Sequence, residues 1–402
     1  MTQTDVVPDV FDHRYMQDPH PMMALMREEQ PVRQVMTPNG LKVWLVTRYD
    51  DVRAALADPR VSKNMLDTDD IVERNLTQPE KRREFAKEIM QYMLNTDPPQ
   101  HTRLRALVSK TFTNRRVEAM RPAIERNTAE LLDAFPATGE VDLIQQLAFP
   151  LPIMVICQLL GVPLEDKEDL RNWIDMLVTT SRPGDAKVAG EAMVGYLGNL
   201  LAAKRAEPTD DILSALIHAT DQDKLTEAEL ISMTFLLLFA GYETTVHTVG
   251  NGALALLVNP EQRELLRRQP SLMSGAVDEF LRFNSPVSTA TFRFTTEPVT
   301  LSGTTIPARE FVLLSLLSAN RDATRFPDPD QLDVARSTTG HLGFGHGVHY
   351  CLGASLGRME VEIALSSLLR RFPNLRLAVP PEELVWRESL LMHGLDRLPV
   401  LL

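Results

Sequence analysis

The segment Phe344-Gly345-His346-Gly347-Val348-His349-Tyr350-Cys351-Leu352-Gly353 carries the strongest signal in this chain. Its first two glycines allow backbone conformations that a Cβ would forbid, and they let the loop approach a flat, bulky group. We expect Cys351 to lie where this loop turns into a helix, because the pattern from 352 to 371 is helical. Free N–H groups and the helix dipole would stabilise a thiolate there, and thiolate is the form of cysteine that ligates metal.

Three interpretations of this segment compete: a glycine-rich turn with an inert cysteine, a zinc site, and a haem site with a thiolate ligand. Zinc is suggested by the clustering of His341, His346, His349 and Cys351 within eleven positions. However, the spacing H-x4-H-x2-H-x-C matches no common structural zinc pattern, and the chain has no C-x-x-C pair. A haem site needs one thiolate and a backbone that comes close to a planar ligand.

The composition indicates one large folded domain with an acidic surface. The 402 residues contain no linker-like tract or repeat, so we expect a single domain over 1–402, and 44% apolar residues suffice for a buried core. The net charge of −12 argues against nucleic acid or an anionic membrane as the main partner. Residues 1–15 lack the basic flank and apolar core of a secretory signal, and no window predicts a membrane helix. We therefore expect a cytoplasmic protein.

The second cysteine, Cys157, lies in the apolar stretch PLPIMVICQLLGVP, which predicts a small buried hydrophobic residue. A disulfide between Cys157 and Cys351 is not expected in a reducing compartment.

Periodicity predicts a mostly helical chain with a small β portion. Residues 41–49 have strand composition and precede a short helix, whereas 61–97 are expected to form helix fragments and a long surface loop. The helical period dominates from His101 to Val258, with breaks at Pro136, Pro150, Pro163, Pro183 and Pro208. Later segments are predicted as helices near 260–268, 271–283 and 352–371, strands within 287–317, and loop over 320–350.

One predicted helix is much longer than the others. Thr226 and Glu229 form a T-x-x-E capping box at its start, and the apolar periodicity then continues to Val258. At about 1.5 Å per residue the helix would be roughly 50 Å long, so it should cross the whole molecule.

The pattern F-G-x-G-x-H-x-C-x-G is the haem-binding signature of the cytochrome P450 family, and residues 344–353 match it at every fixed position. The chain resembles this family over nearly its whole length, since DPPQHTRLR, AGYETT, EFLR, SANRD and the cysteine loop occur in the family's order and spacing. It is most similar to the soluble bacterial class that hydroxylates macrolides, polyketides and steroids. The resemblance implies a triangular helical prism with haem b between the long helix and the cysteine loop. Cys351 would be the axial ligand, and Phe344 and Gly353 would lie against the haem.

The resemblance also identifies an acid–alcohol pair, Glu243 and Thr244, within AGYETT. Oxygen activation on haem needs two protons, which this pair would deliver. The Thr244 hydroxyl can bond back to the carbonyl of Ala240 and loosen the helix, and Gly241 makes such an opening easier. Tyr242 departs from the pattern, because the class commonly has His at this position.

Further residues are assigned by the resemblance alone. Four basic side chains would bind the haem propionates: His101, Arg105, Arg293 and His349. Glu279 and Arg282 share one helix face at i, i+3 and match the family's E-x-x-R motif, which would be structural and paired with Arg336.

The implied activity is monooxygenation, in which R–H, O₂, two electrons and two protons give R–OH and water. A peroxide-driven peroxygenase, a non-oxidative haem protein and a catalyst of epoxidation remain alternatives. The substrate pocket is expected to be apolar and loop-rich, with walls from 61–95 and 170–190. Individual residues expected to line it are Ala240, Val287, Ala290, Leu391 and Met392.

The expected partners are a hydrophobic small molecule, dioxygen, and a ferredoxin with its NAD(P)H-fed ferredoxin reductase. The 402 residues show no flavin or iron–sulfur motif, so the electrons should come from separate proteins, and we expect a monomer. Between Pro98 and Val117 the chain has no acidic residue. It has five basic ones there: Arg103, Arg105, Lys110, Arg115 and Arg116. This basic island is the predicted docking face for an acidic ferredoxin.

Overall fold

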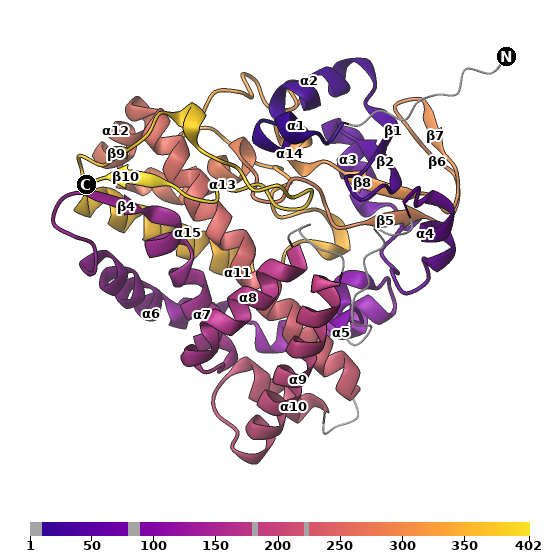
Figure 1. Cartoon of the computed structure of the whole chain (residues 1–402), viewed down its shortest axis with the longest axis horizontal. Coiled ribbons are helices and arrows are strands. Elements are labelled where there is room, and N and C mark those ends of the chain that lie inside the picture. Colours follow the sequence, from indigo (N-terminus) through magenta and orange to yellow (C-terminus); the bar gives the residue numbers. More distant parts are fainter. Residues whose placement is uncertain (1–9, 79–88, 179–183, 221–224) are drawn as a thin grey trace.

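The computed structural model describes residues 10–78, 89–178, 184–220 and 225–402. These residues form one mostly helical domain with a triangular outline, as predicted (Figure 1). The helices of the first half are α1 (His13–Gln17), α2 (His20–Glu29), α3 (Tyr49–Ala57), α4 (Asp69–Asn75), α5 (Gln100–Thr111), α6 (Asn114–Asp133), α7 (Pro150–Leu160), α8 (Lys167–Val178) and α9 (Asp185–Ala206). Those of the second half are α10 (Ile212–Thr220), α11 (Glu227–Val258), α12 (Pro260–Arg268), α13 (Met273–Phe283), α14 (Leu316–Asn320) and α15 (Ala354–Arg371).

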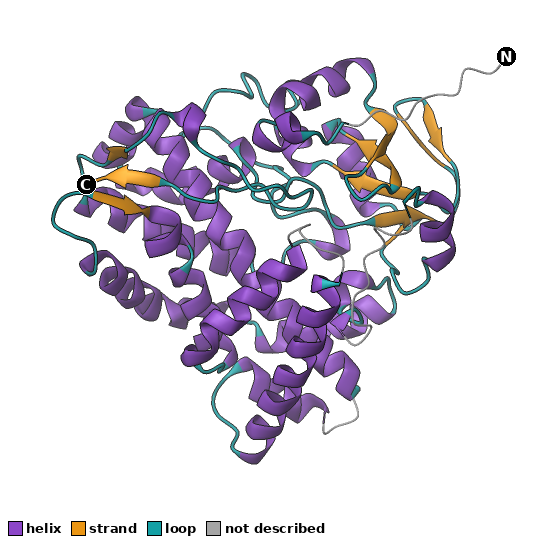
Figure 2. Ribbon diagram, viewed as in Figure 1, coloured by secondary structure: helices purple, strands orange, loops and turns teal. Residues whose placement is uncertain are grey.

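The strands form small sheets at separate places in the molecule (Figure 2). A five-stranded sheet has the order β1-β2-β8-β5-β3, in which only β2 and β8 run parallel. Its strands are β1 (Val32–Met36), β2 (Lys42–Val46), β8 (Phe311–Leu314), β5 (Arg293–Thr295) and β3 (Val61–Ser62). A three-stranded sheet joins β4 (Glu140–Asp142), β10 (Pro399–Leu401) and β9 (Arg376–Leu377), and a hairpin joins β6 (Val299–Leu301) and β7 (Thr304–Ile306). The first sheet holds Arg293, the first residue of β5, between β8 and β3.

The long helix α11 runs through the middle of the molecule (Figure 1). Its capping box forms as predicted, with the Thr226 hydroxyl accepting from the Glu229 N–H and the Glu229 carboxylate accepting from the Thr226 N–H. The helix is long and apolar enough by composition to cross a membrane, but 72% of the relevant window is buried inside the protein. It packs against α7, α9, α13 and α15, so its apolar surface is used in the core.

Most of the apolar core lies around α11, and Cys157 belongs to it. The Cys157 side chain is buried, as predicted, and burial raises the pKa of its thiol to about 12. The thiol therefore stays protonated and packs as a small hydrophobic group.

The structure corrects two predicted boundaries. The stretch FVLLSLL is strand only as far as Leu314, because the Ser315 hydroxyl accepts from the Ser318 N–H and starts α14. The last helix begins at Ala354, so Cys351 precedes it by three residues rather than adjoining its first turn. The predicted break at Pro183 and parts of the predicted pocket walls within 61–95 and 170–190 lie outside the described residues.

Candidate functional site

The cysteine loop, residues 344–353, is a compact turn closed on itself. The Cys351 N–H donates to the Phe344 carbonyl at 2.9 Å, which brings the two ends together. Gly345 and Gly347 have φ of 73° and 74°, a region that side chains with a Cβ rarely adopt. A Cβ on Gly347 would also lie 3.1 Å from the Leu56 carbonyl oxygen. The loop therefore needs glycine at Gly347 both for its conformation and for its contact with α3.

The Cys351 side chain is accessible, yet the surrounding protein desolvates its sulfur. This desolvation raises the pKa of the thiol, whereas the Gly353 N–H and the charges of Arg105 and Arg358 lower it. One N–H group, rather than the whole first turn of α15, thus faces the sulfur. Binding of the sulfur to a metal cation would offset the remaining desolvation, because a coordinating thiol is deprotonated.

Phe344 is fixed by cation–π packing at the start of the loop. The Arg358 guanidinium lies 4.4 Å from the centre of the Phe344 ring, and its Nε donates to Asp278 Oδ1 at 2.7 Å. Asp278 also forms an ion pair with His341 at 3.3 Å. His341 is therefore already paired with a carboxylate rather than grouped with Cys351.

The four predicted propionate ligands gather beside the loop. The His101 and His349 rings lie 4.3 Å apart between centroids, and Arg105 Nη2 donates to the Tyr350 carbonyl at 2.7 Å. Burial, more than neighbouring charge, lowers the pKa of His101 and that of His349, the latter to about 2. Burial also lowers the pKa of Arg293 to about 10, and this side chain is only 5% exposed.

Lys63, which the sequence analysis missed, joins this basic group. Its side chain is 1% exposed, and its ammonium donates to Thr291 Oγ1 at 2.5 Å and to the Phe292 carbonyl at 3.0 Å. Burial, and then the charge of Arg293, hold the pKa of Lys63 well below its usual range. No motif marks this lysine, and only its position next to β3 places it beside Arg293.

The helix α11 presents Ala240 and Thr244 on one of its faces. Ala240 is exposed in the middle of a buried helix, and the Thr244 hydroxyl donates to the Ala240 carbonyl at 3.0 Å. The predicted hydrogen bond forms, but α11 stays continuously helical through it. Gly241 serves packing rather than opening, because a Cβ there would lie 2.8 Å from Ile156 Cδ1 on α7. Tyr242 is buried with its ring edge-on to Phe149.

Glu243 points away from Ala240 and Thr244, toward the C-terminal segment. Its Oε1 lies 3.1 Å from His247 Nε2 and 3.0 Å from Arg387 Nη1. Burial raises the pKa of this carboxyl, but the bond from His247 and the charges of His247 and Arg387 outweigh it, so the pKa lies below its ordinary value. Glu243 is thus an ionised acceptor in a paired network, which the sequence analysis did not anticipate.

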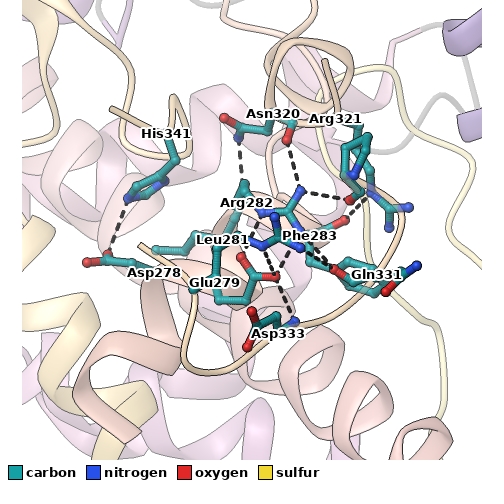
Figure 3. Close-up of polar contacts among 12 residues, drawn as sticks. Asp278, Glu279, Leu281, Arg282, Phe283, Asn320, Arg321, Gln331, Asp333 and His341 are labelled. Atoms are coloured by element: carbon teal, nitrogen blue, oxygen red, sulfur yellow. Dashed lines mark hydrogen bonds and ion pairs between the residues drawn. The ribbon is translucent and has the colours of Figure 1, made fainter. Parts of the chain in front are cut away.

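Glu279 and Arg282 form a fully buried ion pair (Figure 3). Two bonds of 2.7 and 2.8 Å join them, and Arg336 Nε lies 3.4 Å from Glu279 Oε1. Arg282 further donates to three backbone carbonyls, those of Asn320, Pro329 and Gln331. The three predicted structural residues therefore meet, and they fix the chain segment that leads into the cysteine loop.

The predicted pocket residues lie on α11 and on two paired segments later in the chain. Ala240 lies on α11, whereas Val287 forms an isolated bridge with Met392 and the Ser288 N–H donates to the Leu391 carbonyl at 2.9 Å. Val287, Ala290 and Leu391 are partly accessible. Met392 is only 3% exposed, which argues against its forming a wall of the pocket.

The donor set fits haem. Both nitrogens of buried His101 and the Nε of Arg293 have no hydrogen-bond partner among the described residues, as expected for donors that meet two propionates. Cys351 can supply one thiolate from a side chain that is accessible. Among the described residues no group of three or more His, Cys, Asp or Glu side chains is placed to hold a metal ion, so the zinc interpretation has no support in this part of the chain.

Comparisons with known proteins agree with this geometry. The sequence model of the family described as Cytochrome P450 matches residues 191–393. Cytochrome P450 107B1 of Saccharopolyspora erythraea is 52% identical over 99% of this chain and 98% of its own length. The vitamin D(3) 25-hydroxylase of Pseudonocardia autotrophica is 48% identical over 98% of this chain and 96% of its own. The structure of the tirandamycin C-bound P450 monooxygenase TamI has a TM-score of 0.91 at 50% identity, over 98% of this chain and 99% of that one.

The signature loop, the basic group beside it and relatives of nearly equal length lead to one conclusion: this chain belongs to the cytochrome P450 family, as a haem-thiolate monooxygenase with Cys351 as the axial ligand.

Proposed function

We propose that this monooxygenase hydroxylates a sizeable hydrophobic small molecule, such as a macrolide, polyketide or steroid. The observation that supports this most is the accessible face of α11 at Ala240 and Thr244. We expect the partly accessible side chains of Val287, Ala290 and Leu391 to line the same pocket. These side chains are apolar apart from one hydroxyl, which suits a ligand bound mainly by burial of apolar surface. The relatives named for vitamin D(3) and tirandamycin C act on or bind molecules of this class.

When bound, haem supplies the activation of dioxygen, and thiolate ligation favours O–O cleavage. The chain's own residues hold the haem and deliver protons. His101, Arg105, Arg293 and His349, joined by Lys63, would donate hydrogen bonds to the propionates in a region where burial disfavours unpaired charge. Thr244 would pass protons inward from its place next to Ala240, and Glu243 would take them up from the side of the C-terminal segment. The reaction consumes two electrons, two protons and O₂, and releases R–OH and water.

We assign the electrons to a separate ferredoxin, reduced by an NAD(P)H-fed reductase, and we propose a cytoplasmic monomer. Three of the five basic side chains of the island have partners within the protein. Arg103 pairs with Glu229, Arg105 donates to the Tyr350 carbonyl, and Arg116 pairs with Asp210 at 2.9 Å. Lys110 and Arg115 are exposed at the junction of α5 and α6. These two side chains are therefore the better candidates to attract an acidic partner.

The test is a two-stage assay of the haem-loaded protein. Candidate macrolides, polyketides and steroids are titrated while the haem Soret band is recorded, since displacement of water from iron shifts it. Compounds that shift the band are then incubated with NADH or NADPH and a ferredoxin system. The proposal expects a product heavier by one oxygen, formed in step with NAD(P)H consumption. Product formed with hydrogen peroxide but not with the ferredoxin system would instead establish the peroxygenase alternative.

A further inference from the structure

The helix α11 carries a buried polar stripe that the proposed reaction has not fully used. Glu243, His247 and Asn251 follow one another at i, i+4 and i+8, so they lie on one face of the helix. All three are about 1% exposed. At about 1.5 Å per residue the stripe extends roughly 12 Å along α11 from the carboxylate.

The C-terminal segment 386–395 covers this stripe. Arg387 reaches Glu243, and Asn251 Nδ2 donates to the His393 carbonyl at 2.9 Å. A Cβ at Gly394 would overlap Nδ1 of the His247 ring, so glycine is required for the segment to pass over this histidine. Polar side chains of α11 thus face the Arg387 side chain and the backbone of the C-terminal segment.

Beyond His247 the polar groups continue toward the protein surface. The buried His393 ring stacks on Trp386, with centroids 4.1 Å apart and an interplanar angle of 4°. The His20 ring lies edge-on to His393 at 6.2 Å, with Asn284 close enough to influence it. His20 is only partly buried and is the first residue of α2. Its backbone N–H donates to the exposed Asp18 carboxylate at 3.2 Å. These residues form a row that extends from partly buried His20, at the start of α2, through His393, Asn251 and His247 to Glu243.

Unsatisfied polar atoms are concentrated along this row. Among the described residues, twelve buried side-chain nitrogen and oxygen atoms lack a hydrogen-bond partner. Five of them belong to the row: His20 Nδ1, Asn284 Oδ1, Asn251 Oδ1, His247 Nδ1 and Glu243 Oε2. An unsatisfied buried group costs about 1–3 kcal/mol, so five dry atoms would cost as much as the whole stability of a typical domain. Ordered water molecules between these atoms would remove this cost, because each water can bond two to four polar atoms.

We propose that this row, from His20 through His393, Asn251 and His247, is a water-filled path that carries protons from solvent beside α2 to Glu243. The inference rests on the proposed function, since it supplies the protons that monooxygenation consumes. In each transfer a proton binds the outer nitrogen of a neutral imidazole while another leaves the inner nitrogen, and the ring and waters then reorient. The net change is one proton removed from solvent and one added to the Glu243 carboxylate, twice per turnover.

Burial and nearby cations keep the His393 and His20 imidazoles neutral, which is the form that this transfer needs. Burial, and then the charges of His247 and Arg321, lower the pKa of His393 to about 3. Burial, then Arg321, His393 and Arg27, lower that of His20. The groups that face Glu243 are Arg387, with its partners Asp175 and Asp396, and Arg171 of α8. The lowered pKa values leave the His20 and His393 imidazoles neutral between transfers, so each can accept a proton and release it again.

The decisive variants remove the ring nitrogens and keep the shape. His393→Phe keeps the stacking on Trp386, and His247→Leu keeps a similar volume, but neither side chain can carry a proton. His393→Gln and His247→Gln keep polar atoms for water, and His13→Gln changes an exposed histidine outside the row. All are compared in the haem-loaded enzyme with a substrate identified by the Soret titration.

The proposal expects His393→Phe and His247→Leu to lower the fraction of NAD(P)H that yields product about tenfold, and to raise the solvent deuterium isotope effect, since positioned proton carriers contribute about 10²–10⁴-fold. The two glutamine variants should recover part of this loss, and His13→Gln should match wild type. The rate of ferrous–CO formation and the substrate-induced Soret shift should be unchanged in all of them. If wild type itself shows neither ferrous–CO formation nor a substrate-induced Soret shift, the proposed function is wrong. Unchanged coupling and isotope effect in His393→Phe would overturn the path.

A second readout does not depend on turnover. A high-resolution crystal structure of the wild-type protein should show ordered waters bonded to Glu243 Oε2, His247 Nδ1 and Asn251 Oδ1. In His393→Phe the waters next to residue 393 should be lost. A row that is dry in wild type, with these atoms sealed by apolar contacts, contradicts the proposal whatever the kinetics of the variants.

Discussion

The buried pair of Glu279 and Arg282 supports a quantitative prediction about how the cysteine loop is held. Glu279→Gln keeps the size of the side chain and one acceptor for the Asp333 N–H, which donates to Glu279 Oε1 at 3.0 Å. It removes the only carboxylate bonded to Arg282 in the described part of the chain, and both side chains are 0% exposed. Removing one partner of a buried pair typically costs about 3–5 kcal/mol, because the other charge is left uncompensated.

The structure indicates the lower end of that range. Arg282 keeps its bonds to the carbonyls of Asn320, Pro329 and Gln331, which continue to solvate part of its charge. We therefore expect Glu279→Gln to lower the free energy of unfolding by about 3 kcal/mol, which is about a hundredfold in the folding equilibrium constant. The fraction of protein that retains haem should fall as well, because this pair fixes the segment before the cysteine loop.

The assay is urea unfolding of the haem-loaded protein, followed by circular dichroism and by Soret absorption on the same samples. Glu264→Gln is the matched control. Glu264 also pairs at i, i+3, with Arg267 at 2.6 Å, but on the exposed face of α12. Its transition should coincide with that of wild type, since exposed pairs contribute little. If Glu279→Gln unfolds at the same urea concentration as this control, the reasoning about the buried pair is refuted.

Three further predictions concern oxygen chemistry, electron transfer and acid stability. Thr244→Ala removes the hydroxyl beside Ala240. NAD(P)H should still be consumed, but hydrogen peroxide should replace part of the product. If a peroxide assay shows that the yield of product per NAD(P)H is undiminished, Thr244 is not part of the proton route. Reversing Lys110 and Arg115 to Glu should slow ferrous–CO formation at low ferredoxin concentration and low salt, and the defect should shrink as salt screens the charges. Reversing exposed Arg376 on β9, outside the basic island, to Glu should have no effect. The folded-state pKa of His393 is lowered to about 3, from about 6.5 in unfolded chains, so its contribution to stability is complete above pH 6.5 and is lost as the pH falls toward 3. His393→Gln should therefore lose less stability on acidification, by up to about 1.4 kcal/mol per pH unit in urea titrations below pH 6.5; parallel pH profiles for variant and wild type would contradict the pKa shift.

The residues that could be found from the sequence are those whose role depends on local spacing. The capping box of α11, the bond from Thr244 to Ala240 and the pair at Glu279 and Arg282 all join positions three or four residues apart, and all of them form. The family signature added the contact with Arg336, which spacing alone does not give.

What the sequence analysis missed depends on which segments pack together. Lys63 reads as one more surface lysine until β3 pairs with β5 and places it beside Arg293. Glu243 was assigned only to pass protons inward, because its partner Arg387 is 144 residues away in the sequence. The helix at Leu316 was hidden in an apolar run with strand composition, in which one serine cap decides where the strand ends.

The central claim, that Cys351 binds the haem iron, is tested most directly by the ferrous–CO absorption spectra of wild type, Cys351→Ser and Cys157→Ser. Cys157 is buried in the core, and its pKa, raised to about 12 by burial, keeps it protonated, so it cannot replace the ligand. Wild type and Cys157→Ser should both show the red-shifted band of a thiolate-ligated haem, and Cys351→Ser should lose it. A Cys351→Ser protein that keeps the red-shifted band would contradict the assignment of Cys351 as the axial ligand.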